Sequence, residues 1–218
     1  MKNQWNVGIL LFEDVDVMDY SGPYEVFNLS FRDANQVQEF FESEKELEGK
    51  PFNVKTIAQH KQLITADHGL KVMPDFCFDT YNQTFDIVII PGGPLKAIKS
   101  GMNNKEVLNW IVSQHKAGAT IASVCTGAFF LAAAGLLTNK KATTNILALD
   151  FLENQFSDVE VVRNVRFVDN GDVLTSAGIS AGIDMSMYIV ERLLGIEAAR
   201  TATMTMEYPY YESASIKQ

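Results

Sequence analysis

The sequence predicts an α/β protein, a three-layer sandwich in which helices cover both faces of a mostly parallel central sheet. Segments with strand and helix patterns alternate along most of the 218 residues, as crossover-connected parallel strands require. Residues 85–93 contain a continuous apolar run, which is typical of a central strand covered on both faces. With 47% hydrophobic residues and no linker-like composition, the chain predicts one domain over residues 1–218.

The amino-terminal part predicts the first three strands of the sheet and one helix between them. We expect strands at residues 5–12, 52–59 and 85–93, a helix at 21–35, and a hairpin at 63–78. Ser21 is the expected cap of that helix, with Pro23 in its first turn. The charged residues 38–50 indicate a solvated surface segment, and Asp67 to Gly69 supply the hairpin turn.

The carboxyl-terminal part predicts two further strand positions, a hairpin and several helices. Residues 103–118 have helical spacing and end at a glycine, Gly118. Asn170-Gly171 is a strong signal for a two-residue turn. In chain order we expect a strand at 120–124, a helix at 126–137, a short strand at 141–145, a helix at 146–156, a hairpin at 165–178, and helices at 180–195 and 196–208.

Composition excludes several function classes. The formal net charge of −9 opposes the basic surface that nucleic acid or anionic lipid requires, so we expect neither as a partner. No apolar stretch approaches the ~20 residues of a membrane span, and the acidic residues after position 12 exclude a signal peptide. With two cysteines there is no disulfide framework and no Cys-rich metal site, which favours a cytoplasmic protein.

Cys125 stands out by its position. It follows the apolar strand at 120–124 and precedes the expected helix at 126–137. Ligands of open parallel sheets bind beyond the carboxyl ends of the strands, where Gly92 and Gly93 are also expected. The positive end of the following helix would lower the thiol pKa by about 0.2 to 1.5 units from ~8.5, which predicts an activated thiolate. Cys77, between two phenylalanines, is interpreted as a packing residue.

Five segments in order resemble the ThiJ/PfpI superfamily, whose fold is flavodoxin-like. They are DYSGPYEVF, FDIVIIPGG, SVCTGAFFLAAAGLL, KATTN and TSAGISAGIDMSMYIVERLLG. The sequence is most similar to the branch that contains isocyanide (isonitrile) hydratases and the sensor domains of AraC-type regulators. The resemblance implies that Cys125 is the reactive cysteine of a nucleophile elbow. It also selects Asp19, from the acidic residues at 13–19, as the partner of that cysteine.

The charge of Asp19 follows from its expected neighbour. An ionised carboxylate beside a thiolate raises both pKa values, whereas a protonated one donates a hydrogen bond to sulfur. We therefore expect Asp19 to be protonated when Cys125 is ionised, and to act as a general acid or proton shuttle.

The sequence departs from the superfamily at Asn145, where many members carry a histidine after a Thr-Thr pair. Asn145 can hydrogen-bond a substrate but cannot act as a base. His60, His68 and His115 lie in segments that do not obviously reach the site. The sequence therefore disfavours a Cys-His dyad of the kind that hydrolyses amides.

Gly92, Gly93 and Thr126 have two interpretations each. The glycines either permit a tight turn or, through the Gly93 N–H together with that of Thr126, form an oxyanion or substrate hole. Thr126 is either a helix cap or a residue whose hydroxyl contacts the ligand.

Three functional hypotheses follow from the resemblance. The first is a cysteine-dependent isocyanide hydratase that uses Cys125 and Asp19, a small-molecule substrate, and no metal or organic cofactor. The second is another cysteine hydrolase, an amidase or a glyoxalase-like enzyme of the superfamily. The third is a non-enzymatic ligand or redox sensor, although the chain leaves no room for a helix-turn-helix region after the predicted domain. The resemblance also implies a homodimer, with the helix containing residues 21–27 as a self-complementary face.

Overall fold

A seven-stranded sheet forms the centre of the molecule in the computed structural model, which describes residues 2–43 and 48–210. The strand order is β10-β11-β7-β6-β1-β2-β5, and only β10 runs antiparallel to its neighbour. The strands are β1 Trp5–Leu10, β2 Phe52–Ala58, β5 Phe76–Cys77, β6 Ile87–Ile90, β7 Thr120–Ser123, β10 Phe167–Asp169 and β11 Val173–Ser176. This architecture confirms the predicted mostly parallel α/β fold.

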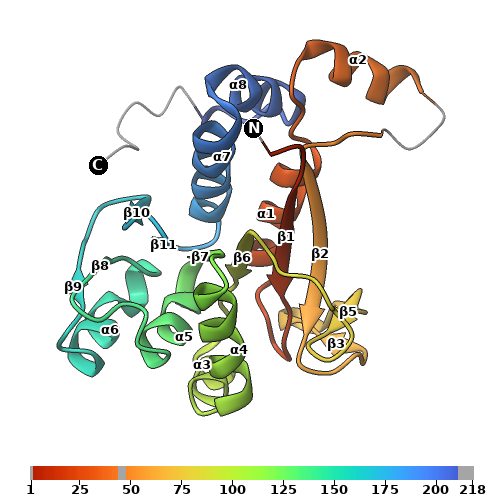
Figure 1. The fold of residues 1–218 in the computed structure, drawn as a ribbon. Helices are drawn as coiled ribbons and strands as arrows, with labels where there is room; N and C mark the ends of the chain where they lie inside the picture. Colours follow the sequence, from red (N-terminus) through yellow and green to blue (C-terminus); the bar gives the residue numbers. More distant parts are fainter. Residues whose placement is uncertain (1, 44–47, 211–218) are drawn as a thin grey trace.

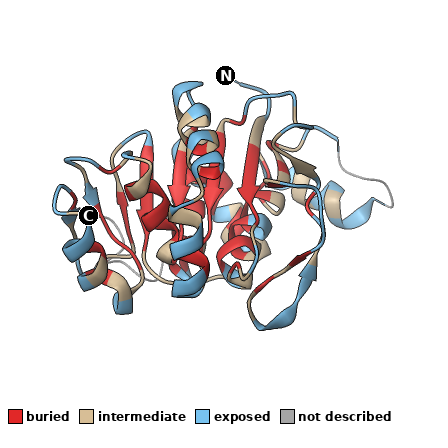
Figure 2. Cartoon of the chain, turned by 90° about the horizontal axis from the view of Figure 1, so that it is seen from below, coloured by how far each residue is buried: buried red, intermediate tan, exposed pale blue. Residues whose placement is uncertain are grey.

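Helices cover both faces of this sheet and complete the three layers (Figure 1). One face carries α1 Val17–Asn28, α7 Ala181–Leu194 and α8 Ile196–Thr205. The other carries α3 Leu95–Met102, α4 Lys105–Lys116, α5 Ala128–Ala133 and α6 Leu149–Gln155. Figure 2 shows the buried residues concentrated in the strands and on the inner faces of these helices. The central strand β6 is buried at all four positions, as its apolar sequence predicts.

The first helix begins earlier than predicted. Asp16, not Ser21, is the N-cap of α1, and its side chain accepts hydrogen bonds from the backbone N–H groups of Met18 and Asp19. Pro23 therefore lies inside the helix rather than in its first turn. The helix also ends sooner, at Asn28, because a second helix, α2 Ala34–Glu42, starts from its own N-cap at Asp33. This helix occupies part of the segment that was predicted to be a solvated surface.

The other predictions hold with shifted boundaries. The hairpin of β3 Ile64–Thr65 and β4 Lys71–Val72 turns at residues 67–69 as expected, but β5 that follows it joins the main sheet beside β2. The helix α3 was not predicted. The expected strand at 141–145 is reduced to β8 Lys141–Ala142, which pairs with β9 Glu160–Val161 outside the main sheet.

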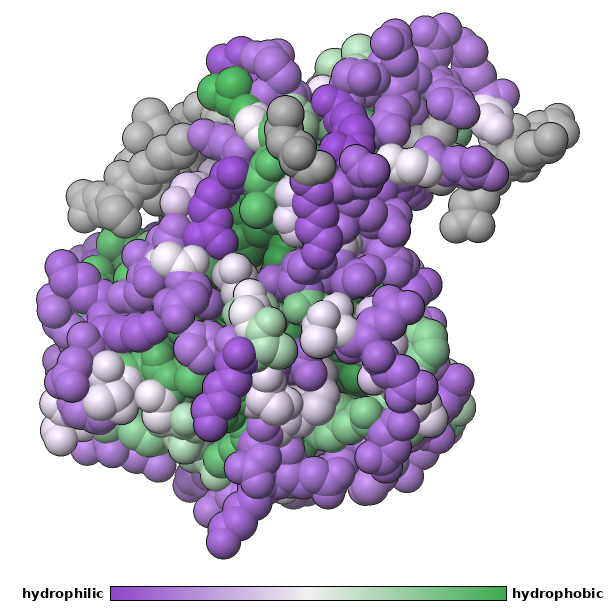
Figure 3. Space-filling model, viewed as in Figure 1, coloured by the Kyte–Doolittle hydropathy of each residue, from purple (hydrophilic) through white to green (hydrophobic). Residues whose placement is uncertain are grey.

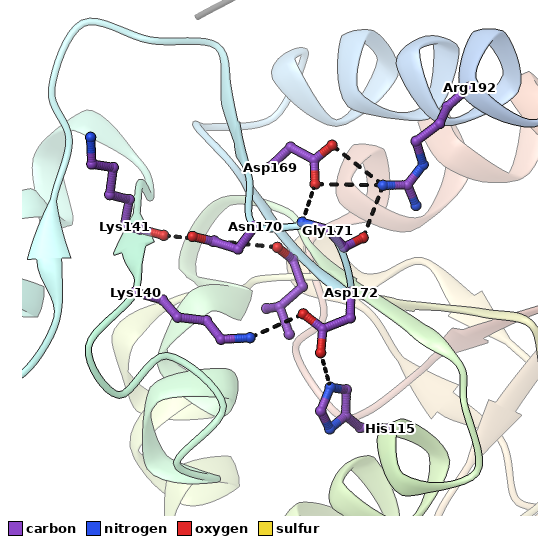
Figure 4. A network of polar contacts seen from close by, with 9 residues as sticks. His115, Lys140, Lys141, Asp169, Asn170, Gly171, Asp172 and Arg192 are labelled. Carbon is purple, nitrogen blue, oxygen red and sulfur yellow. Dashed lines mark hydrogen bonds and ion pairs between the residues drawn. The ribbon is translucent and has the colours of Figure 1, made fainter.

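A polar network fixes the turn of the β10–β11 hairpin (Figure 4). The hairpin forms as predicted, but its two turn residues are Gly171 and Asp172, one position later than Asn170-Gly171, because the Asn170 N–H donates to the Val173 carbonyl. Gly171 adopts a positive φ of 89°, and its N–H donates to Asp169. Asp172 pairs with His115 of α4 at 2.7 Å and with Lys140 at 3.0 Å. Because β7 and β11 are parallel, this network lies at the amino-terminal ends of these strands, whereas Cys125 lies at the carboxyl ends.

The surface is largely hydrophilic on the face seen in Figure 3, where hydrophobic residues show mainly in the seams between elements. Within the described ranges, 2–43 and 48–210, none of the helices has the length and apolar character needed to cross a membrane.

Candidate active site

Cys125 lies in a strained turn directly after β7. Its φ is 57°, a left-handed conformation that is uncommon for a residue with a side chain. Two hydrogen bonds hold the backbone in this conformation: the Cys125 N–H donates to the Ala177 carbonyl at 3.1 Å, and the Thr144 hydroxyl donates to the Cys125 carbonyl at 2.7 Å. The main chain thus holds the thiol at the carboxyl end of the sheet, as the elbow prediction requires.

The Cys125 thiol is buried, with 6% of the residue exposed. It accepts a hydrogen bond from the Asn145 side-chain amide at 3.4 Å. The backbone N–H groups of Thr126 and Ile179 also lower the pKa of the thiol. These donors favour the thiolate, but they are weaker than the groups that oppose it.

The prediction of a lowered Cys125 pKa is wrong for the resting site. Burial, followed by repulsion from Asp19, raises the pKa of Cys125 to about 11. The helix contributes less than expected because residues 125–127 form a 3₁₀ turn and α5 begins only at Ala128. The resting thiol is therefore protonated at neutral pH.

Asp19 lies in the first turn of α1 and is fully buried. Its Oδ2 accepts a hydrogen bond from the Gly92 N–H at 2.9 Å. Its Oδ1 makes no conventional hydrogen bond among the described residues, and the Cys125 thiol interacts with the carboxyl group. Burial, and then the charge of Asp16, raise the pKa of Asp19 to about 7, although the Gly92 N–H and the thiol oppose this.

Asp19 and Cys125 form a coupled acid pair. Burial raises both pKa values and the Asp19 charge further raises that of Cys125, so the pair carries at most one negative charge at neutral pH. At rest that charge belongs to the Asp19 carboxylate. Transfer of the thiol proton to Asp19 produces the state expected from the sequence, a thiolate beside a protonated carboxyl group. The pair can thus generate a nucleophile and a proton donor in one step.

Gly92 and Gly93 bring the second strand end against this pair. A Cβ atom at Gly92 would lie 2.5 Å from Thr126 Oγ1 and 2.8 Å from Asp19 Oδ2. At Gly93 it would lie 2.6 Å from the Asp14 carbonyl oxygen. Both positions therefore require glycine because neighbouring backbone and side chains approach closely.

The expected oxyanion hole is not free in this structure. The Gly93 N–H donates to Thr126 Oγ1 at 3.0 Å, and that hydroxyl donates back to the Gly93 carbonyl at 2.8 Å. The Gly92 N–H is already bonded to Asp19. Thr126 therefore connects the glycine loop to the elbow through its side chain, while its backbone N–H lowers the pKa of Cys125. Both glycine N–H groups therefore have protein partners here, and the oxyanion-hole interpretation stays a prediction.

The histidines lie away from the thiol. His115 pairs with Asp172 at the amino-terminal ends of the strands, opposite to Cys125. The His68 side chain is 89% exposed, and His60 lines a separate cavity. Cys77 is half-buried at the end of β5, and a hydrogen bond with Thr80 is the main cause that lowers its pKa. Cys77 is therefore the more acidic thiol, in contrast to the expectation that it only packs.

Three residues of the site were missed in the sequence. Asp16 caps α1 and raises the Asp19 pKa, Thr144 fixes the elbow carbonyl, and Ile179 supplies a backbone donor to the sulfur. An acidic residue before an apolar helix is a recognised cap signal, so Asp16 could have been found. Ile179 has no comparable signal because its contribution comes from the main chain. Across residues 2–43 and 48–210, no cluster of three or more His, Cys, Asp or Glu is arranged to hold a metal ion.

Comparisons with known proteins agree with this fold. The DJ-1/PfpI family model matches residues 6–192. Isonitrile hydratase from Pseudomonas putida is 29% identical over 212 residues, which cover 96% of this chain and 82% of the hydratase. The HTH-type transcriptional regulator GbdR from Pseudomonas aeruginosa is 26% identical over 90% of this chain but only 48% of the regulator. The crystal structure of a ThiJ/PfpI family protein from Pseudomonas syringae has a TM-score of 0.78 at 26% identity, covering 94% of this chain and 75% of that one.

Proposed function

The chain belongs to the DJ-1/PfpI family, and on this premise we propose that it is a cysteine-dependent hydratase that converts an isocyanide and water into an N-substituted formamide. Similarity to isonitrile hydratase over most of both chains supports this substrate class. Regulators match over about half of their own length.

The observation that carries the proposal is the buried pair of Cys125 and Asp19, with an amide rather than an imidazole at the sulfur. An isocyanide carbon is electrophilic toward sulfur but has no leaving group. Its hydration needs a nucleophile, a proton donor and exclusion of bulk water, and it does not need a histidine base. Asparagine instead of histidine at position 145 therefore slows this reaction little. The same replacement leaves a Cys-His dyad without its base.

The first half of the reaction forms a covalent thioimidate. The Asp19 carboxylate takes the Cys125 thiol proton as the sulfur attacks the terminal carbon of R–NC. A carbon–sulfur bond forms, and Asp19 returns the proton to the same carbon to give R–N=CH–S–Cys125. The proton and the electron pair therefore both end on the former isocyanide carbon, and Asp19 is again ionised.

The second half releases the product. Asp19 accepts a proton from an attacking water, hydroxide adds to the carbon, and the nitrogen receives the proton. The tetrahedral intermediate R–NH–CH(OH)–S–Cys125 then loses the sulfur, and the hydroxyl proton passes through Asp19 to the departing thiolate. The products are R–NH–CHO and the original thiol, so one water is consumed for each isocyanide.

The test is formamide production from isocyanides of different sizes, such as cyclohexyl and tert-butyl isocyanide, measured by NMR. We expect Cys125→Ala to be inactive and Asp19→Asn to be slowed by about 10²- to 10⁴-fold, the usual contribution of a general acid or base. Asp19→Glu should be milder. Cys77→Ala is the matched control, because that thiol lies at the end of β5, and it should keep its activity.

Two outcomes would contradict the proposal. If no isocyanide gave formamide above the uncatalysed rate, the substrate class would be wrong, and amides and 2-oxoaldehydes would be tested next. If Cys125→Ala kept full activity, the covalent mechanism would be wrong. Tight isocyanide binding without turnover would instead favour a ligand sensor.

The proposal includes a homodimer in a reducing, cytoplasmic compartment. The apolar residues of the predicted contact helix mostly face the core of the same chain, as Tyr20 and Phe27 do. Exposed apolar side chains instead lie beside site residues: Met18 next to Asp19, and Leu147, which is 94% exposed, near Asn145. Sedimentation should give about twice the 24.3 kDa chain mass, and Leu147→Asp should lower it. A single-chain mass for the unmodified protein at micromolar concentration would contradict the dimer.

A further inference from the structure

A cavity of about 350 Å³, apart from the Cys125 site, lies at the carboxyl ends of β1 and β2, beside α3 and α4. Its walls come from β1 and the loop after it, from the end of β2, and from α3, α4 and α5. None of the described residues of the Cys125 site lines it: Cys125, Asp19, Thr126 and Asn145 all lie outside. The volume is in the range of small-molecule sites, at its lower end.

The floor of this cavity is apolar and firmly packed. Leu10 and Phe130 are 1% exposed, and Ala97 and Val107 are 7% exposed. Phe12 closes the side nearest the loop after β1, with its ring 5.2 Å from that of Phe130. Because these side chains come from a strand and three helices, the floor is preformed and suits an alkyl or aryl group.

The polar groups at the mouth favour one negative charge. Lys96 and Ser100 are one turn apart on α3, and both line the cavity. Lys96 makes no ion pair among the described residues. The first turn of α3 has no side-chain cap, so its positive end adds to the attraction for an anion.

Two acidic residues of the lining limit that charge. Glu13 and Asp14 also line the cavity, and the Glu13 carboxylate accepts the Thr65 N–H at 3.1 Å. The two acidic residues outnumber the one lysine, so a phosphate ester or a dicarboxylate would be repelled more strongly than a ligand with one negative charge. A single carboxylate bears less of that repulsion than a dianion, and Lys96 offers it an opposite charge.

We propose that this cavity binds a small monocarboxylate, with its alkyl or aryl body on the apolar floor and its carboxylate at Lys96 and Ser100. The site is separate from Cys125 and does not depend on the hydratase reaction. Binding is therefore measured directly rather than through activity.

Calorimetry with hexanoate and benzoate tests the proposal, with hexanamide and benzamide as uncharged controls. The acids should bind at least tenfold more tightly than the amides. Lys96→Gln should weaken acid binding by about fivefold or more, whereas Lys99→Gln, on the same helix but outside the lining, should leave it unchanged. Ala97→Leu should block binding by filling the floor, and Ser100→Phe does the same from the mouth if the first variant does not fold.

The proposal is overturned if neither acid binds at millimolar concentration, or if the amides bind as well as the acids. It is also overturned if Lys96→Gln and Lys99→Gln weaken binding equally, which would indicate a general effect of charge. Backbone NMR shifts confined to residues around Cys125, rather than α3 and the loop after β1, would place the ligand in the other site and refute the proposal.

Discussion

Substitution of the buried acid Asp19 by asparagine should stabilise the protein at alkaline pH while it impairs the proposed reaction. The folded-state pKa of Asp19 is about 7, against an ordinary value of 3.8. Because this pKa is raised, the protonated carboxyl group stabilises the fold fully below the ordinary value. That contribution is lost as the pH rises through about 7.

The magnitude follows from the two pKa values. Their difference, at about 1.36 kcal/mol for each pH unit, corresponds to roughly 4 kcal/mol. Asparagine does not titrate, so it escapes this loss and still offers an oxygen to the Gly92 N–H. The free energy of unfolding of Asp19→Asn, relative to the unmodified protein, should therefore rise by about 4 kcal/mol between pH 4 and pH 8. Any constant packing cost of the amide cancels in this comparison.

Urea unfolding at pH 4, 6 and 8, followed by circular dichroism, measures this difference. Asp33→Asn is a control for the same chemical change at an exposed position: Asp33 is the N-cap of α2, and asparagine caps equally well. Its effect should change little with pH. If the relative stability of Asp19→Asn varied by less than about 1 kcal/mol over this range, burial would not oppose ionisation of Asp19, and the reasoning would be refuted.

Three further predictions concern the same site. Iodoacetamide at pH 7 should label Cys77 before Cys125 in the unliganded protein, because burial and Asp19 raise the pKa of the second thiol; faster labelling of Cys125 by mass spectrometry would contradict this. Asp16→Asn keeps the cap of α1 but removes the charge that raises the Asp19 pKa. The acidic limb of the pH–activity profile should therefore move to lower pH, and an unchanged profile would exclude this role of Asp16. Gly92→Ala should cost about 1 to 3 kcal/mol of stability and at least tenfold in activity, because its Cβ would lie 2.8 Å from Asp19 Oδ2; near-normal unfolding and turnover would show that the loop can yield.

Local patterns in the sequence were enough for the architecture. Continuous apolar residues in β6 require cover on both faces, and the Asn170-Gly171 signal predicts an antiparallel hairpin, although the turn itself forms one residue later. Both signals extend over a few residues, so they can be interpreted without knowledge of distant contacts. The position of Cys125 at a strand end is a signal of the same kind. The boundaries of α1 were less well predicted, although Asp16 was available as a cap.

The sequence by itself therefore determined the fold class, the order of most elements and the place of the elbow cysteine. The tertiary structure decided the chemical state of that cysteine, because its pKa depends on burial and on Asp19, which reaches it from another strand-to-helix connection. It also decided that the Gly92 N–H bonds to a carboxylate 73 positions away and that Thr126 occupies the Gly93 N–H. Charge states and hydrogen-bond partners depend on distances between residues that are far apart in the chain. The local periodicity of apolar residues contains no information about those distances.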